Sequence, residues 1–410
     1  MKKIIIGFSL IFVLLLSACG EPTWQEKYDL GIRYFSEGNY EEAVIAFTAA
    51  IEIEPKNAEA YIGLADTYIN MGDWEKAQES LINGLEEAED EESLRDKLSD
   101  MQCEIGEKHL EQGEYEEAIK DFQDALDYNP DNKAAKKGLA DAFEGSGEEH
   151  LAQGDYEEAE KDFRAALEID PEREDAHLGL SDALMEMGEL EGAIDALRDA
   201  LEVLDNPGEA LRDRLDELES LKKALDALMD TFSAENLDDV FQEESIKDIL
   251  DILNKYMDRC YDGKRFIKNY TGVGYKMLME NFIYYGDLIN GEPNGKGDGI
   301  CPVELYDHYT GSWSNGKPNG EGSEITVGAG FRSLDIGTYI DGIGNGSVQH
   351  TLFYTAGAYT GEYVVFQFTV EDGYVVDGNV PIEISSGLPR HWASVPWDWG
   401  RTVYVKGFEE

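Results

Sequence analysis

The sequence is poor in basic residues, and this shortage excludes some classes of partner. Its 410 residues include 34 lysines and arginines against 87 aspartates and glutamates, a net charge of −53. Residues 1–260 hold 68 acidic and 24 basic side chains (net −44), whereas residues 261–410 hold 19 and 10 (net −9). Nucleic acid and anionic lipid headgroups are poor partners for so acidic a surface. Basic proteins, basic peptide segments or divalent cations fit it better.

Motifs of catalysis and metal binding are also missing. The six histidines do not form the HExxH spacing, and the chain has no GxSxG, GxxxxGK[ST] or CxxC sequence. The carboxylates that could serve as acids or bases lie mostly on the polar faces of predicted helices, where solvent or a partner explains them better. We therefore predict no enzymatic activity, no cofactor and no metal. A catalytic site in the last 50 residues is the alternative that this leaves open.

Cysteines are too few for a disulfide framework. The chain has four, at positions 19, 103, 260 and 301. Cys103 fits a small apolar residue of a helix. A bridge between Cys260 and Cys301 is left open.

The N-terminal segment, MKKIIIGFSLIFVLLLSAC, has a basic start and then an apolar run from Ile4 to Leu16 that is short for a bilayer span. Its end, Leu16-Ser17-Ala18-Cys19, resembles the lipobox of bacterial lipoproteins. The resemblance implies a signal peptide over residues 1–19, acylation of Cys19, a short tether over 20–23, and a membrane-anchored protein that faces outside the cytoplasm. An ordinary signal peptide with a chance cysteine is the alternative. No second hydrophobic stretch of spanning length follows.

A six-residue motif recurs five times along the acidic half. The copies are GNYEEA, GDWEKA, GEYEEA, GDYEEA and GELEGA, with leading glycines at 38, 72, 113, 154 and 188. Apolar residues keep a helical period on both sides of each glycine, which predicts helical hairpins with a glycine at the turn. This pattern resembles the tetratricopeptide repeat (TPR) family over residues 24–207 and implies an α-solenoid of about five hairpins. Two of the spacings are 41 residues instead of 34, which predicts longer helices.

TPR arrays bind partners in a groove lined by the first helix of each hairpin, and the resemblance implies such a groove here. Its lining would be apolar at one end and increasingly acidic toward the other, which favours a basic protein segment as partner. That the acids only keep the protein soluble is the alternative. The predicted groove residues are Tyr28, Phe35, Asp66, Glu107, Asp141, Glu144, Glu148, Asp175 and Asp182.

The segment 208–259 is predicted to form capping and connecting helices, followed by a linker over 260–279. Leucines recur on one stripe of the stretch from Glu209 to Leu228. This stripe predicts a cap for the last repeat, with a dimer seam as the alternative. A second amphipathic helix is expected from Leu237 to Met257.

A second repeat system begins near residue 280. The stretches YYGDLINGEPNGKG (284–297) and YTGSWSNGKPNGEG (309–322) align at an offset of 25 residues, and each contains Asn-Gly twice. Asn-Gly between aromatic strands predicts β-hairpins. The pattern resembles the MORN repeat family, which implies an antiparallel β-hairpin array over 280–374. Fainter copies follow, and residues 375–410 are expected to be a β-rich tail.

The sequence therefore predicts a multidomain α then β fold, a TPR-like solenoid followed by a MORN-like sheet, that acts as a membrane-anchored scaffold for protein partners. The alternative is a lipoprotein that binds cell-wall or surface glycans through aromatic side chains. Its stacking platforms would be Trp392, Trp397 and Trp399 together with Tyr309 and Trp313.

Overall fold

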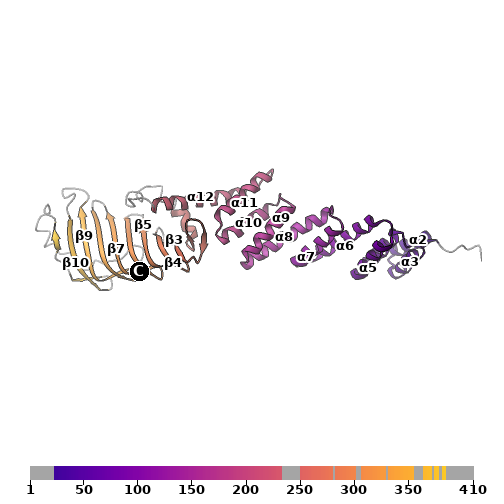
Figure 1. Ribbon diagram of the computed structural model, residues 1–410, viewed down its shortest axis with the longest axis horizontal. Coiled ribbons are helices and arrows are strands. Elements are labelled where there is room, and N and C mark those ends of the chain that lie inside the picture. Colours follow the sequence, from indigo (N-terminus) through magenta and orange to yellow (C-terminus); the bar gives the residue numbers. More distant parts are fainter. Residues whose placement is uncertain are drawn as a thin grey trace, which may run out of the picture. The chain divides into compact units, whose positions relative to one another are not determined.

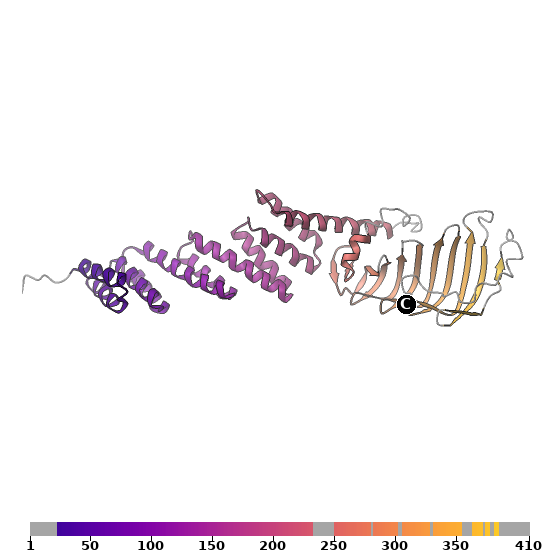
Figure 2. The ribbon, with the colours of Figure 1, turned by 180° about the vertical axis from the view of Figure 1, so that it is seen from behind.

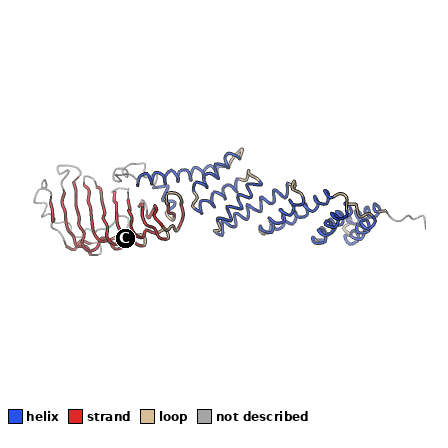
Figure 3. Tube along the Cα trace, viewed as in Figure 1, coloured by secondary structure: helices blue, strands red, loops and turns tan. Residues whose placement is uncertain are grey.

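The structure, a computed structural model, describes residues 23–232, 250–279, 282–301, 306–328, 331–354, 363–371, 374–377 and 381–384. Helices come first along the chain and strands follow, as predicted (Figure 3). Contacts divide the chain into two units, residues 1–149 with 162–171 and residues 150–161 with 172–410. The predicted signal peptide and Cys19 lie outside the described residues.

Antiparallel helical hairpins make up the first repeat system (Figure 1). Their turns contain a glycine in the left-handed region, such as Gly72 (φ 78°) and Gly113 (φ 74°), which confirms the predicted role of the motif. The first helix starts at a capping box, in which the Thr23 hydroxyl accepts from the Glu26 amide and the Glu26 carboxylate accepts from the Thr23 amide. The helices are α2 (Trp24–Ser36), α3 (Tyr40–Ile53), α4 (Ala58–Met71), α5 (Trp74–Glu87), α6 (Glu91–Gln112), α7 (Tyr115–Tyr128), α8 (Lys133–Gln153), α9 (Tyr156–Ile169), α10 (Glu174–Met187) and α11 (Leu190–Val203).

The two long repeat spacings lengthen helices, as predicted. Helix α6 has 22 residues and α8 has 21, against 14 for α4. Seven residues are about two helical turns, so the extra length keeps the same apolar face toward the neighbouring helix.

Phenylalanine rings on glycines hold the hairpins of the first unit together. The buried ring of Phe47 lies against Gly31, where an added Cβ would be 2.7 Å from the ring, and Phe122 covers Gly106 in the same way. Phe163 repeats the contact with Gly147. Small residues at these sites let the helices approach closely.

Helix α12 (Glu209–Phe232) closes the helical part of the second unit by packing on α11. Its leucine stripe is buried within the chain, so the stripe acts as the predicted cap and is not available as a dimer seam. The stripe residues, each at most 9% exposed, are Leu211, Leu215, Leu218, Leu221, Leu225 and Leu228. Most of the helix predicted over 237–257 lies outside the described residues. Residues 250–253 are helical and continue into η1 (Asn254–Tyr256).

The strands of the second unit form one antiparallel sheet (Figure 2). Neighbours in the chain are mostly neighbours in the sheet, in the order β11-β10-β9-β8-β7-β6-β5-β4-β3-β1-β2, and β12 also pairs with β10. The strands are β1 (Arg259–Tyr261), β2 (Phe266–Lys268), β3 (Gly272–Met279), β4 (Phe282–Ile289), β5 (Glu292–Cys301), β6 (Tyr306–Ser314), β7 (Lys317–Gly328), β8 (Phe331–Ile340), β9 (Ile343–Tyr354), β10 (Tyr363–Glu371), β11 (Tyr374–Asp377) and β12 (Pro381–Ile384).

The range 260–279, predicted as a linker, is instead part of this sheet. It holds most of β1 and all of β2 and β3, which pair with one another and with β4. Strands β1 and β2 have only three residues each, and this range lacks the Asn-Gly turns of the later hairpins, so the sequence signal for its strands is weak. The sheet therefore starts about twenty residues before the predicted repeats.

The first Asn-Gly pair of each repeat copy forms a hairpin turn, as predicted, and the second does not. Asn290-Gly291 and Asn315-Gly316 have positive φ at both residues, as a type I′ turn requires, and Asp341-Gly342 makes the same turn in a fainter copy. The second pair of each copy is different. Gly295 and Gly320 lie inside β5 and β7, where the register shifts at a β-bulge.

Tyrosines that lie over a row of glycines form the core of the sheet. Gly286, Gly297, Gly311, Gly322 and Gly337 are direct partners across five strands, so one face of the sheet has no side chains along this row. Rings fill the space above it. The buried cluster contains Tyr284, Tyr309, Tyr339, Trp313, Leu288 and Cys260.

Candidate functional site

The predicted groove residues are carried by the first helix of successive hairpins: α2, α4, α6, α8 and α10. Glu144 and Glu148 are four residues apart on α8, and Asp175 and Asp182 are seven apart on α10. Residues at these spacings share one face of a helix. Each pair therefore lies on one face of its own helix.

The apolar end of the predicted groove is largely internal packing. Tyr28 and Phe35 are half-buried against the cluster of Ala43, Phe47 and Leu64. The Tyr28 ring meets that of Phe47 edge to face at 5.7 Å. Burial, followed by nearby carboxylates that include Asp66, raises the pKa of the Tyr28 phenol. These two rings therefore act mainly as core residues, with only part of their surface open to a partner.

Two of the predicted acids are held by cations of the same chain. Lys97 of α6 contacts Asp66 of α4 at 2.5 Å, and Arg214 of α12 contacts Asp182 of α10 at 2.7 Å. The partners are 31 and 32 residues apart, close to one repeat, so each pair joins a first helix to the second helix after it along the chain. A lysine or arginine about one repeat after a predicted groove acid is the sequence signal that could have revealed these pairs.

Fewer of the predicted acids are accessible than the sequence predicts. Glu107, Glu148 and Asp175 are exposed, whereas Asp141 and Glu144 are half-buried and interact within the chain. We call Glu107, Glu148 and Asp175 the exposed acids. Of the predicted groove acids, these three are the ones whose side chains a basic partner can reach from solvent.

Acidic side chains on α6 affect the buried thiol of Cys103. The pKa of Cys103 is raised to about 11 by burial and then by Glu107, Asp100 and Glu104. Burial and neighbouring carboxylates both disfavour the thiolate, so Cys103 is a packing residue and not a nucleophile.

A hub that sequence reasoning did not find joins the last TPR-like hairpin to the first strands. The guanidinium of Arg259 is 5% exposed and donates to the carbonyl oxygens of Met185 (2.6 Å) and Phe266 (3.2 Å). It also contacts the Glu186 carboxylate at 2.5 Å. The Phe266 amide donates to the Gly188 carbonyl at 3.0 Å, so the α10–α11 turn is bonded to the β1–β2 hairpin. No sequence motif around Arg259 predicts that its side chain is buried at this joint.

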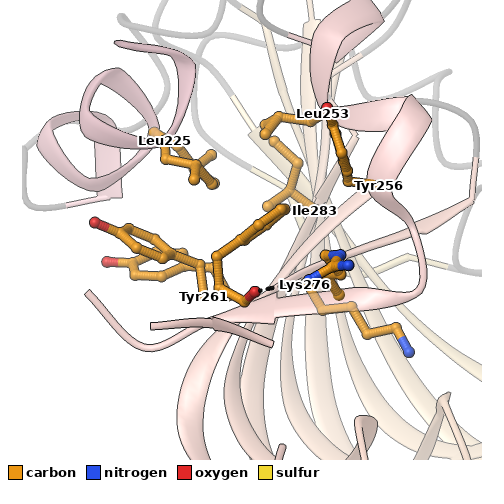
Figure 4. Close-up of a pocket in the computed structure, with 10 residues that line it drawn as sticks. Leu225, Leu253, Tyr256, Tyr261, Lys276 and Ile283 are labelled. Carbon is orange, nitrogen blue, oxygen red and sulfur yellow. Dashed lines mark hydrogen bonds between the residues drawn. The ribbon is translucent and has the colours of Figure 1, made fainter. Parts of the chain in front are cut away.

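A small cavity near this hub is a packing space and not a ligand site. Its volume is about 20 Å³, room for about one water molecule. As Figure 4 shows, Leu225 of α12, Leu253 and Tyr256 face Tyr261, Lys276 and Ile283 of the sheet around it. The mostly apolar lining shows that α12 and the sheet share a core.

The two hairpin aromatics predicted as stacking platforms, Tyr309 and Trp313, are buried and not open to a ligand. Tyr309 is fully buried and Trp313 is 3% exposed, and their rings meet edge to face at 5.4 Å. Tyr309 also meets Tyr339 at 5.0 Å. That part of the glycan hypothesis is wrong, because these rings cover the glycine row of their own sheet. Trp392, Trp397 and Trp399 lie outside the described residues.

Cys260 is a free, buried thiol and does not bridge to Cys301. Strand β1 is separated from β5 by β3 and β4, so their backbones are about 14 Å apart at the usual strand spacing. A disulfide needs Cα atoms within about 7 Å. Burial raises the pKa of the Cys260 thiol.

Within the described ranges, no group of three or more His, Cys, Asp or Glu side chains is arranged to hold a metal ion. The helices of that part of the chain also lack the length and apolar character needed to cross a membrane.

Comparison with known families agrees with this architecture. Residues 34–99 and 150–213, and residues 103–149, match tetratricopeptide repeats, and residues 309–326 match a MORN repeat. The predicted combination of TPR repeats with a C-terminal MORN repeat is therefore confirmed. No curated protein matches the chain.

Several solved structures are similar to the chain at low identity. The TPR domain of P58(IPK) is 19% identical, with 55% of this chain and 73% of that chain covered and a TM-score of 0.25. The MamA protein is 20% identical, with 44% and 90% covered and a TM-score of 0.25. TTC0263, a thermophilic TPR protein of Thermus thermophilus, is 22% identical, with 48% and 98% covered and a TM-score of 0.21.

Proposed function

We propose that this chain of tetratricopeptide and MORN repeats is a membrane-anchored scaffold outside the cytoplasm that binds protein partners and catalyses no reaction. Stacked hairpins provide surface area along an array in place of one deep site. The exposed acids on first helices are the observation that carries the proposal, because they lie open to basic protein segments, whereas Asp66 and Asp182 are held by Lys97 and Arg214. Attraction of this kind extends over about 10 Å at 0.1 M salt.

Anchoring depends on Cys19 in this proposal, because its position in Leu16-Ser17-Ala18-Cys19 fits the acylated residue of a lipobox. Each methylene of an acyl chain in the bilayer contributes about 0.8 kcal/mol, so two or more chains hold a protein firmly. Cys19→Ser should therefore move nearly all of the protein, expressed in bacteria, out of the sedimented membranes. Cys103→Ser, at a buried site, is the matched control and should stay with the membranes. A Cys19→Ser protein that remains membrane-bound would contradict the lipid anchor.

If partners bind through the exposed acids, removal of their charge should reduce partner capture. We expect the triple variant Glu107→Gln, Glu148→Gln and Asp175→Asn to capture about five- to tenfold less partner at low salt, since an exposed ion pair contributes up to about 1 kcal/mol. The measurement is cross-linking on intact cells followed by mass spectrometry. A difference that disappears at high salt would identify its electrostatic origin.

The matched control removes the same charge from second helices. Glu52→Gln, Asp127→Asn and Glu168→Gln change exposed acids on α3, α7 and α9. This control should capture partners as the unchanged protein does. Equal capture by both triple variants would show that the acids serve solubility alone.

A further inference from the structure

The face of the sheet opposite the tyrosine core contains an open groove. Its volume is about 690 Å³, and it extends over strands β3 to β8. Tyr285, Asp298, Thr310, Ser323 and Ile336 are direct partners from β4 to β8 and all line it. Because successive residues of a strand point to opposite faces, this row lies on the other side from Tyr284 and Tyr309.

Both ends of the groove are apolar and open to solvent. Val273 on β3 is 51% exposed and Ile336 on β8 is 46% exposed. These strands are five positions apart in the sheet, so the two side chains are about 24 Å apart at the usual strand spacing. Half-exposed branched aliphatic side chains at both ends favour an occupant that covers them.

The middle of the groove is acidic, and hydrogen bonds hold its carboxylates. Three carboxylates, those of Asp287, Asp298 and Glu321, line it together with Lys296, whose ammonium group donates to the Ser312 hydroxyl at 2.8 Å. The Lys296 amide donates to Asp287 at 2.9 Å, and the Thr338 hydroxyl donates to Glu321 at 2.8 Å. A carboxylate accepts up to about four hydrogen bonds, so these contacts orient the acids and leave acceptor capacity for an occupant.

Asp298 at the centre is ionised at neutral pH. Burial would raise the pKa of its carboxyl, but hydrogen bonds with His308 (3.2 Å) and Thr310 (2.5 Å) outweigh burial and hold the pKa below its usual range. Beside it, Tyr285 stacks on Tyr275 with ring centroids 4.5 Å apart. An ionised carboxylate next to an aromatic wall suits a guanidinium or ammonium group.

We propose that this groove binds an extended peptide segment with Arg or Lys at its centre and an apolar side chain near each end. Charge complementarity selects the basic centre, and the exposed Val273 and Ile336 select the ends. A span of about 24 Å corresponds to seven or eight residues of extended chain. The proposal rests on the scaffold function above, since it specifies the partner chemistry of the sheet.

The probe is a fluorescent eight-residue peptide with leucine at both ends and two arginines at the centre. Its matched control carries two glutamates in place of the arginines. Fluorescence anisotropy with the full chain at 50 mM salt should show binding of the basic peptide, and at least about tenfold weaker binding of the acidic one.

Variants then locate the binding. Asp287→Asn with Glu321→Gln should weaken the basic peptide by about tenfold, and Ile336→Ser by about fivefold. Glu292→Gln with Asp341→Asn removes the same charge from two exposed positions outside the groove lining, one directly after a hairpin turn and one within a turn, and should change binding less than about twofold. Near-identical circular dichroism spectra would show that all variants fold.

Three results would overturn the proposal: no binding of the basic peptide, equal binding of the acidic one, or equal losses in groove and control variants. Displacement of the peptide by a soluble chito-oligosaccharide would instead assign the groove to glycans. If the peptide does not bind but the exposed acids still capture partners, the peptide groove alone is overturned. If the folded protein shows neither peptide binding nor partner capture, the result counts against the scaffold function itself.

Discussion

Gly322→Ala should lower the free energy of unfolding of the sheet by about 3 kcal/mol. An added Cβ would lie 2.5 Å from Cζ and 2.6 Å from Cε2 of Tyr309, and closer still to its hydroxyl oxygen. Overpacking of this kind costs about 1–3 kcal/mol, at the upper end where nothing can move. The Tyr309 ring cannot move easily, because it is fully buried against Trp313 and Tyr339 and donates to the Ser312 carbonyl at 3.2 Å.

Hydrogen exchange of the β6 and β7 amides, followed by mass spectrometry, is the suitable measurement because it reports the sheet alone. The matched control is Gly192→Ala in α11, where the nearest atom to the added Cβ is 3.6 Å away. There alanine should stabilise the helix by about 0.5–1 kcal/mol. Unchanged protection of β6 and β7 in Gly322→Ala would show that the tyrosine core tolerates a methyl group.

A second substitution tests the cause of the loss. Tyr309→Phe removes the hydroxyl oxygen that the new Cβ approaches most closely. In the double variant the two effects should be less than additive by about 1 kcal/mol, because the residues are in contact. Strict additivity would place the cost of Gly322→Ala elsewhere than at Tyr309.

Local sequence signals predicted both repeat systems because the interactions that form them are local. The glycine at each helical turn and the Asn-Gly pairs at residues 290 and 315 need left-handed backbone, which few residue types adopt. The seven-residue insertions kept the helical period and therefore lengthened α6 and α8. Patterns repeated several times are also easier to separate from chance than single ones.

What the sequence did not predict depends on contacts between distant residues. Lys97 and Arg214 reach Asp66 and Asp182 one repeat away, which removes two acids from the predicted groove. Tyr309 and Trp313 looked like platforms because aromatic residues on a strand can face either solvent or core. Only the pairing of Gly297, Gly311 and Gly322 across strands shows which face their rings cover. The sequence of a single strand does not show which residues of neighbouring strands it is paired with.

The joint between helices and sheet is a further example. Residues 260–279 have neither the helical motif nor the Asn-Gly turns, and for that reason a linker was expected. The structure places β1 to β3 there and covers them with α12, so the sheet and the last helices share one core. Arg259 is the polar centre of that joint.

Arg259→Ala should therefore be the most damaging charge change in the second unit, with a loss of about 3–5 kcal/mol, the usual cost of removing one partner of a buried ion pair. Arg259 is 5% exposed, so its removal leaves the Met185 and Phe266 carbonyl oxygens without this donor in a buried place. Of the two ion pairs that Glu186 makes within the described residues, the contact with Lys268 at 3.3 Å remains. Hydrogen exchange should rise in β1, β2 and the α10–α11 turn together.

The matched control for Arg259→Ala is Arg198→Ala, which removes an arginine with two acidic partners, Glu219 and Asp195, from an exposed helix face. Water replaces those contacts, so this variant should exchange as the unchanged protein does. If Arg259→Ala also left β1 and β2 protected, the apolar core of Leu225, Tyr261 and Ile283 would suffice to join helices to sheet. Loss confined to β1 and β2, with the α10–α11 turn unaffected, would mean that the hub supports the hairpin without coupling it to the helices.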